Sequence, residues 1–230
     1  MPTVSILTAT ETGSLPSRAA LRTILARYLN LPSKKITFSY GATGKPELSP
    51  DLGNAGVQFN LSHCRDWAML AVTLDRRIGA DIEFTDRGFA TEEIAQHLFS
   101  AGEVNMLHAL PAEDRPAAFF SCWTRKEAYM KAVGEGLSLP LDSFEVAFGP
   151  GVTPALLRVE GLPDEPARWT IHNIAAQTGM LLPWWSKAAI INCSRATDSG
   201  NSERLHVTKS FKHPGGFSRS FDDHPFIPNP

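Results

Sequence analysis

The sequence predicts an α+β protein made of two similar lobes, each with a helix packed on a small, mostly antiparallel sheet. A helical pattern followed by short β-prone runs occurs twice along the chain, with the change near residues 85–90. The 230 residues are enough for two lobes of about 100 residues each, and a hydrophobic content of 43% is enough to build a core. We therefore expect lobes at residues 1–86 and 87–195.

The first lobe is expected to begin with a helix over residues 17–31, because leucines recur there at helical spacing and arginines lie on the polar side. Short β-prone runs follow, and a loop rich in Gly and Pro at residues 41–50 separates the first run from the others. Strands are expected at residues 35–39, 58–61, 67–74 and 77–84. The last two of these runs are expected to pair as neighbours.

The second lobe is expected to hold three helices and three strands. Its longest helix starts near Phe119 and ends at Gly134 and Gly136, which provide a helix stop. From residue 196 to 230 the chain turns to Ser, Asn, Asp, Gly and Pro without a periodic apolar pattern, so we predict a disordered or loosely attached tail. The other elements are expected at residues 91–99, 100–110, 144–148, 168–174 and 187–193.

Charge and cysteine content narrow the function class. The 22 Lys and Arg nearly balance the 24 Asp and Glu, so no global positive field would hold nucleic acid or an anionic membrane. Cys64, Cys122 and Cys193 form no CxxC pattern, as is typical of free thiols in a reducing compartment. The chain has no apolar run of the roughly 20 residues that cross a bilayer and no leader pattern. We expect a cytoplasmic protein.

Acidic residues recur in two places. On the long helix, Trp123, Glu127 and Lys131 stand four residues apart and share one face. Asp81 and Glu83 point to the same side of the strand predicted at residues 77–84, and two carboxylates so close favour an oxygen-seeking cation such as Mg²⁺, or Mn²⁺. The alternatives are a surface ion pair on the helix and a solvated strand edge.

Basic residues near these carboxylates indicate phosphate chemistry. Lys45 lies in the Gly- and Pro-bracketed loop, and His63 follows Ser62 at the entry to a strand. Lys126 and Lys131 flank Glu127. Each of these side chains has an ordinary structural explanation alone, but together they supply the cations that phosphoryl transfer requires beside a metal site.

Four segments then show a specific resemblance. GKPEL (44–48), FNLSH (59–63), IGADIE (78–83) and WTRKEAYMKAVGEGLSLPLDSFEV (123–146) resemble the three signature blocks of the larger, pseudo-dimeric 4′-phosphopantetheinyl transferases, the type that activates surfactin synthetase. The string WxxKEAxxKxxGxGL with an upstream GxDIE is the most specific part. The resemblance covers roughly residues 17–194.

This resemblance implies a holo-[acyl-carrier-protein] synthase type of activity. Such enzymes move the phosphopantetheine arm of coenzyme A onto a serine of an acyl or peptidyl carrier protein and release 3′,5′-ADP. The KEA form points to the subgroup that serves peptide-synthetase, polyketide and fatty-acid carriers. The expected partners are coenzyme A and a carrier protein, and the two lobes of a pseudo-dimer imply a monomer.

The resemblance also implies roles for single residues. Asp81, Glu83 and Glu127 would bind Mg²⁺, and Lys131 would hold the pyrophosphate and protonate the leaving group. Glu127 is the favoured general base, with Glu103 as the second candidate catalytic residue. The expected coenzyme A contacts are Gly44, Lys45 and Pro46 on the adenine and 3′-phosphate side, Ser62 and His63 at phosphate, and Lys126 and Lys131 beside Glu127.

The N-terminus departs from the family pattern. Members usually place a strand and a basic segment of some 30 to 40 residues before the first helix, whereas residues 1–16 precede it here. We expect Arg18 and Arg22 to contact the 3′-phosphate in part. Two other functions stay open: a non-catalytic coenzyme A or carrier-protein binding relative, and a metal-dependent nucleotide hydrolase.

Overall fold

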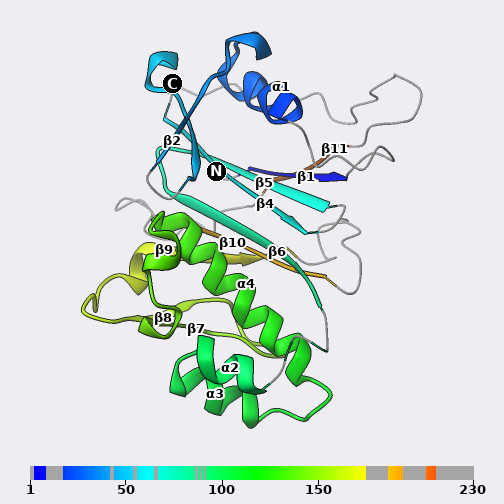
Figure 1. The fold of residues 1–230 in the computed structure, drawn as a ribbon, viewed down its shortest axis with the longest axis vertical. Helices are drawn as coiled ribbons and strands as arrows, with labels where there is room; N and C mark the ends of the chain where they lie inside the picture. Colours follow the sequence, from blue (N-terminus) through cyan, green and yellow to red (C-terminus); the bar gives the residue numbers. More distant parts are fainter. Residues whose placement is uncertain are drawn as a thin grey trace.

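The computed structural model confirms the α+β class, with helices packed on small, mostly antiparallel sheets. Along the long axis of the molecule, Figure 1 shows α1, a first sheet, a second sheet, α4 and the α2–α3 pair in succession. Within the described residues, no helix is both long and apolar enough to cross a membrane. The structure describes residues 3–8, 18–41, 44–53, 56–64, 67–85, 88, 90, 92–174, 186–193 and 206–210.

The first sheet has four strands in the order β11-β1-β5-β4. Its centre is the antiparallel pair of β4 (Val57–Cys64) and β5 (Trp67–Leu74), and β1 (Thr3–Thr8) adds to β5 in antiparallel register. The outer strand β11 (His206–Ser210) runs parallel to β1. The sheet is therefore assembled from both ends of the chain.

Helix α1 (Arg18–Leu29) covers this sheet because one of its faces is apolar. Its side chains Leu21 and Leu25 are buried against Phe59 and Leu70 of the sheet. The loop after α1 contains a 3₁₀ turn and a two-stranded hairpin, β2 (Phe38–Tyr40) with β3 (Pro46–Leu48), followed by a second 3₁₀ turn. We call residues 38–48 the β2–β3 hairpin.

The second sheet has three antiparallel strands in the order β6-β10-β9. Its strands are β6 (Ile78–Phe84), β10 (Ser186–Cys193) and β9 (Trp169–Asn173). Helix α4 (Arg115–Val133) packs along this sheet and buries aromatic side chains of its own against those of the second lobe. The remaining elements are α2 (Glu92–Leu98), α3 (Ala101–His108), β7 (Phe144–Val146) and β8 (Leu156–Val159).

The two sheets meet where β6 passes β4. The backbone N–H of Ala80 donates to Asn60 Oδ1 at 2.9 Å, and the N–H of Ile82 donates to Ser62 Oγ at 3.3 Å. Both acceptors come from β4 and both are buried. Side chains of β4 thus take the place of a neighbouring strand on this side of β6, which satisfies N–H groups that would otherwise be buried without partners.

Most predicted elements are present, with ends shifted by a few residues. The expected pairing of residues 67–74 with residues 77–84 is wrong, because β6 pairs with β10 instead. The lobe boundary after residue 86 stays a prediction. Strand β6 lies before this boundary in the sequence, but it belongs to the second sheet. In the tail predicted as disordered, residues 206–210 form β11, and the rest lies outside the described residues. Strands β1, β3, β8 and β11 are additional to the predicted set.

Gly79 sets the distance between β6 and α4. A Cβ atom at this position would lie 1.9 Å from the Ala128 carbonyl oxygen and 2.5 Å from the Ala132 amide nitrogen. Both contacts are backbone atoms inside a helix and cannot rotate away. The glycine of the GxDIE segment is therefore required for close strand–helix packing.

We expect Gly79→Ala to lower the free energy of unfolding by at least about 1–3 kcal/mol, because the added methyl group forces the helix away from the strand. Urea unfolding of both proteins measures the change. Gly41→Ala is the matched control, since a Cβ there has no atom within 4 Å and its φ is not positive. Equal destabilisation by the two substitutions would contradict this account.

Candidate functional site

The centre of the candidate site is an ion pair between strand β6 and helix α4. Lys131 Nζ lies 2.5 Å from Asp81 Oδ1. Ser62 of β4 joins them, because its hydroxyl donates to Asp81 Oδ1 at 3.0 Å and accepts from Lys131 Nζ at 3.1 Å. We call these three side chains the Asp81 cluster. It brings together residues 69 positions apart along the chain.

The surroundings of Asp81 and Lys131 differ from those that the two ordinary explanations require. Asp81 is only 1% exposed, so it does not lie on a solvated strand edge. Its ion-pair partner Lys131 is the residue that the alternative interpretation placed in a surface pair with Glu127. Burial raises the pKa of Asp81, and Lys131 opposes this shift as the nearest positive charge. Within the described part of the chain, Asp81 Oδ2 is buried and has no hydrogen-bond partner.

Glu83 and Glu127 extend the negative charge around Asp81. Trp123 Nε1 donates to Glu83 Oε1 at 3.4 Å, which links α4 to β6 a second time. Burial raises the pKa of Glu83, and the neighbouring Asp81 raises it further. Burial also raises the pKa of Glu127 to about 7, with Asp81 and then Glu83 adding to the shift and Lys131 opposing it. The three predicted metal ligands are therefore close enough to repel one another.

A divalent cation fits this donor set by its chemistry. All three side chains offer carboxylate oxygens, and the buried Asp81 Oδ2 needs a positive partner. The fit is partial in geometry, because no three Asp, Glu, His or Cys side chains among the described residues gather as a ready-made metal site. The ammonium of Lys131 lies at the other oxygen of Asp81.

All of the expected coenzyme contacts except Lys126 and Lys131 lie on the first lobe. His63 is exposed on β4, next to the buried Ser62. Gly44 and Pro46 lie at the tip of the β2–β3 hairpin, where Gly44 adopts a φ of 76° that favours glycine. Lys45 lies between them and reaches the second lobe, where its Nζ donates to the Lys131 carbonyl oxygen at 2.7 Å.

Arg18 and Arg22 brace the β2–β3 hairpin. Arg22 Nε donates to the Ile36 carbonyl oxygen at 2.9 Å, and its guanidinium lies over the Phe38 ring. The guanidinium of Arg18 lies over the Tyr40 ring at 5.8 Å from its centre. Arg18 is exposed, so its remaining donors face solvent. The structure gives both arginines a role in packing that the sequence did not indicate.

The structure encloses Lys126 and Glu103 in the second lobe, which argues against their expected roles. Lys126 Nζ lies 2.7 Å from Glu103 Oε2, and both side chains are 0% exposed. Lys126 also donates to the carbonyl oxygens of Leu141 and Phe144, at 2.8 Å and 2.5 Å. A lysine enclosed in this way cannot reach a phosphate at the Asp81 cluster.

Both carboxylate oxygens of Glu103 also accept hydrogen bonds from the backbone around it. It accepts from the Ser100 and Val146 N–H groups, and the Ser100 contact completes a capping box at the start of α3.

Successive helical residues of α4 are turned by about 100°, so Lys126 faces the core while Glu127 faces the Asp81 cluster. Arg125 is also buried, donates to Asn173 Oδ1 and the Ala147 carbonyl oxygen, and was missed by sequence reasoning. No pattern in the sequence distinguishes this arginine from a solvent-facing one, because its partners lie far away along the chain.

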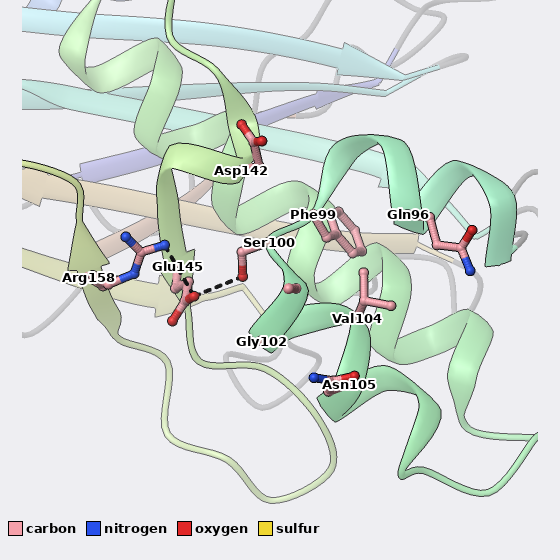
Figure 2. A pocket seen from close by; sticks show the side chains of 10 residues that line it. Gln96, Phe99, Ser100, Gly102, Val104, Asn105, Asp142, Glu145 and Arg158 are labelled. Atoms are coloured by element: carbon pink, nitrogen blue, oxygen red, sulfur yellow. Dashed lines mark hydrogen bonds and ion pairs between the residues drawn. The ribbon is translucent and has the colours of Figure 1, made fainter.

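A cavity of about 520 Å³ lies between the α2–α3 turn and the β7–β8 pair, and Asp81, Glu83 and Glu127 do not line it. Figure 2 shows Glu145 at one side, where it accepts from Ser100 Oγ at 2.9 Å and from Arg158 Nη2 at 3.3 Å. None of the predicted site residues lines this cavity. The candidate site is therefore the Asp81 cluster with Glu83 and Glu127.

We expect Lys126→Met to lower the free energy of unfolding by about 3–5 kcal/mol, because it leaves the buried Glu103 carboxylate without its counter-charge. The double variant Glu103→Gln/Lys126→Met should regain part of this loss. Urea unfolding at neutral pH measures both. A single variant as stable as the wild type would show that the pair is not a structural one.

The raised pKa of Glu127 predicts a pH-dependent stability. A carboxyl group whose pKa rises from 4.5 to about 7 on folding binds protons more tightly in the folded state, so the free energy of unfolding falls as pH rises through this interval. Glu127→Gln removes this contribution, and the variant should gain stability relative to the wild type between pH 4.5 and pH 7. Melting temperatures across this range test it, with the exposed Glu113→Gln as control. Parallel curves for wild type and Glu127→Gln would refute the assignment.

Comparison with known proteins gives one consistent family. A model of the 4′-phosphopantetheinyl transferase superfamily matches residues 77–182. The 4′-phosphopantetheinyl transferase HetI of Nostoc sp. is 36% identical over 154 residues, which cover 64% of this chain and 65% of that protein. The putative 4′-phosphopantetheinyl transferase slr0495 of Synechocystis sp. is 30% identical over 206 residues, which cover 87% and 79%. The 4′-phosphopantetheinyl transferase Sfp of Bacillus subtilis is 39% identical over 126 residues, which cover 55% and 54%.

The matched part of the chain spans less than two thirds of the Nostoc and Bacillus proteins. The match to the Synechocystis protein is longer and includes both lobes. The superfamily match begins just before β6 and includes all of α4, the two elements that carry the three carboxylates and Lys131. The family inferred from the sequence motifs is thus confirmed, and the chain belongs to the 4′-phosphopantetheinyl transferase superfamily.

Proposed function

We propose that this protein transfers the 4′-phosphopantetheine arm of coenzyme A to a serine hydroxyl of an acyl or peptidyl carrier protein. The observation that carries the proposal is the Asp81 cluster, which places a buried acid and an ammonium beside Glu127, whose pKa is about 7. Membership of the superfamily supports it, and three similar proteins carry the name 4′-phosphopantetheinyl transferase.

The reaction is a displacement at phosphorus. The serine oxygen forms a bond to the phosphorus atom that bears pantetheine, and the bond from that phosphorus to the bridging oxygen breaks. The bonding electrons leave with 3′,5′-ADP, and the serine proton passes to a base. A serine hydroxyl is a weak nucleophile at neutral pH, so the site must remove its proton and offset the charge on the phosphates.

Glu127 is the proposed general base. A group whose pKa lies near the working pH is partly ionised, and it still holds a proton strongly enough to take one from an alcohol in the transition state. Its carboxyl group lies on the same helix face as Lys131, one turn away. The Lys131 ammonium would stabilise the negative charge of the pyrophosphate and supply a proton to the leaving oxygen.

We propose that Asp81, Glu83 and Glu127 hold Mg²⁺, with Mn²⁺ as an alternative. When bound, the cation would offset charge on the phosphate oxygens of coenzyme A. The support is the buried Asp81 Oδ2, which lacks a partner within the described residues, and the raised pKa of each carboxyl group. A cation close to them would lower all three pKa values, so the pKa of about 7 describes Glu127 before the cation binds.

The first lobe would bind the nucleotide end of coenzyme A. Gly44 and Pro46 are assigned to the adenine side, and Ser62 to phosphate. His63 and Arg18 are exposed, and we assign His63 to phosphate and Arg18 to the 3′-phosphate. Lys126 is left out of this set, because it is enclosed in the second lobe.

The expected partner is a carrier protein of fatty-acid, polyketide or nonribosomal peptide synthesis. The similarity to Sfp of Bacillus subtilis favours the type that activates surfactin synthetase over the shorter holo-[acyl-carrier-protein] synthases. We expect the protein to act as a monomer, since the proposed site is built from two sheets of one chain. The expected location is the cytoplasm.

The decisive experiment mixes the protein, coenzyme A and Mg²⁺ with an apo acyl carrier protein or an apo peptidyl carrier domain. Mass spectrometry of the carrier should show the addition of one phosphopantetheine group, and EDTA should prevent it. No addition to either carrier would overturn the proposed function.

Substitutions of the carboxylates locate the chemistry. Asp81→Asn and Glu127→Gln should each lower kcat/KM by about 10²-fold or more, because each removes charge that the transition state requires. Glu113→Gln, an exposed carboxylate away from the site, is the matched control. Turnover within about threefold of wild type in either site variant would refute the assignment of that residue.

A further inference from the structure

Lys45 makes an unexpected contact between the β2–β3 hairpin and the end of α4. Its Nζ donates to the Lys131 carbonyl oxygen at 2.7 Å and to the Ile78 carbonyl oxygen at 3.5 Å. The partners belong to α4 and β6, the two elements that form the Asp81 cluster with β4. One side chain from a hairpin tip therefore touches both elements at the point where they meet.

The carbonyl groups at the C-terminal end of α4 need hydrogen-bond donors from outside the helix. The helix ends at Val133, and Gly134 adopts a left-handed φ of 86° while its N–H donates to the Met130 carbonyl oxygen. The next carbonyl along the chain belongs to Lys131, and no later helical N–H is available for it. A helix carries partial negative charge at this end, so an ammonium stabilises it. Lys45 supplies that ammonium from the other lobe.

The environment of Lys45 matches this role. The side chain is half-buried, and burial lowers its pKa. An ammonium that has lost water needs acceptors in the protein, and the two carbonyl oxygens provide them. Such a group is less available to a phosphate than an exposed turn residue would be.

The hairpin that carries Lys45 is itself held in place. Its tip is closed by the Gly44 N–H, which donates to the Gly41 carbonyl oxygen at 2.9 Å, and by the Gly41 N–H, which donates to the Lys45 carbonyl oxygen at 3.2 Å. Arg22 and Arg18 of α1 pack over its rings. A continuous set of contacts thus leads from α1 through the hairpin to α4.

We propose that Lys45 is a positioning residue, which fastens the β2–β3 hairpin to the C-terminal end of α4 and so directs Lys131 toward Asp81. Lys131 is then held at both ends, by Lys45 at its carbonyl oxygen and by Asp81 and Ser62 at its ammonium. The structural part of this inference is independent of the reaction, and its kinetic part rests on the proposed function.

The structural part is tested without coenzyme A. In Lys45→Met, amide hydrogen exchange in the last turn of α4 should become about tenfold faster or more, the change expected when a hydrogen bond from a charged group is lost. Lys45→Arg, which can still donate to carbonyl oxygens, should restore most of the protection. Lys34→Met, an exposed lysine of the same lobe, is the control. Unchanged exchange in Lys45→Met would overturn the inference.

The kinetic part separates positioning from substrate contact. With an apo carrier, Lys45→Met should lower kcat about tenfold and change the KM for coenzyme A by less than about threefold, since Lys131 is displaced while the nucleotide contacts remain. A rise in KM with kcat unchanged would show that Lys45 contacts coenzyme A instead. If the wild type transfers nothing, the proposed function fails, and the exchange experiment still decides whether Lys45 fastens the two parts together.

Discussion

The ion pair between the buried Asp81 and the half-buried Lys131 is the interaction on which the rest of the candidate site depends. A carboxylate that is 1% exposed must be offset by a nearby positive charge, and the protein uses one from a different element. This requirement ties β6 to α4, and the hydroxyl of Ser62 ties β4 to both. The arrangement holds two sheets in register while leaving one oxygen of Asp81 without a partner among the described residues. The proposed site for cation and phosphate chemistry is thus also the contact that joins the two sheets.

Helix α4 has charged residues on its core-facing side and on the side that contacts Asp81. Lys126 and Arg125 point inward and are satisfied by Glu103, Asn173 and backbone carbonyls. Glu127 and Lys131 point toward Asp81. The inner contacts fix the rotation of the helix about its axis, and the rotation decides which carboxylate faces the cluster. Adjacent charged residues of one motif therefore have different physical roles, one in folding and one in the proposed chemistry.

Prediction from the sequence succeeded where a signal was local. Helical spacing located α1 and α4, because that pattern depends on the burial of one face, and short apolar runs located the buried strands β5 and β6. It failed where the partner was distant. β6 pairs with β10, more than 100 positions away, and β1 joins β11 from the other end of the chain. The short strands β3 and β8 are too brief to show a period.

The sequence by itself determined the family, the α+β class and the carboxylates and lysine of the candidate site, because these follow from residue types at set spacings. Only the tertiary structure decided which charges meet. It paired Lys131 with Asp81 and enclosed Lys126 with Glu103, and it turned Lys45 toward the end of α4. Spacing along a helix or strand states which side chains share a face, whereas burial and the contacts across that face depend on elements that lie far apart in the chain.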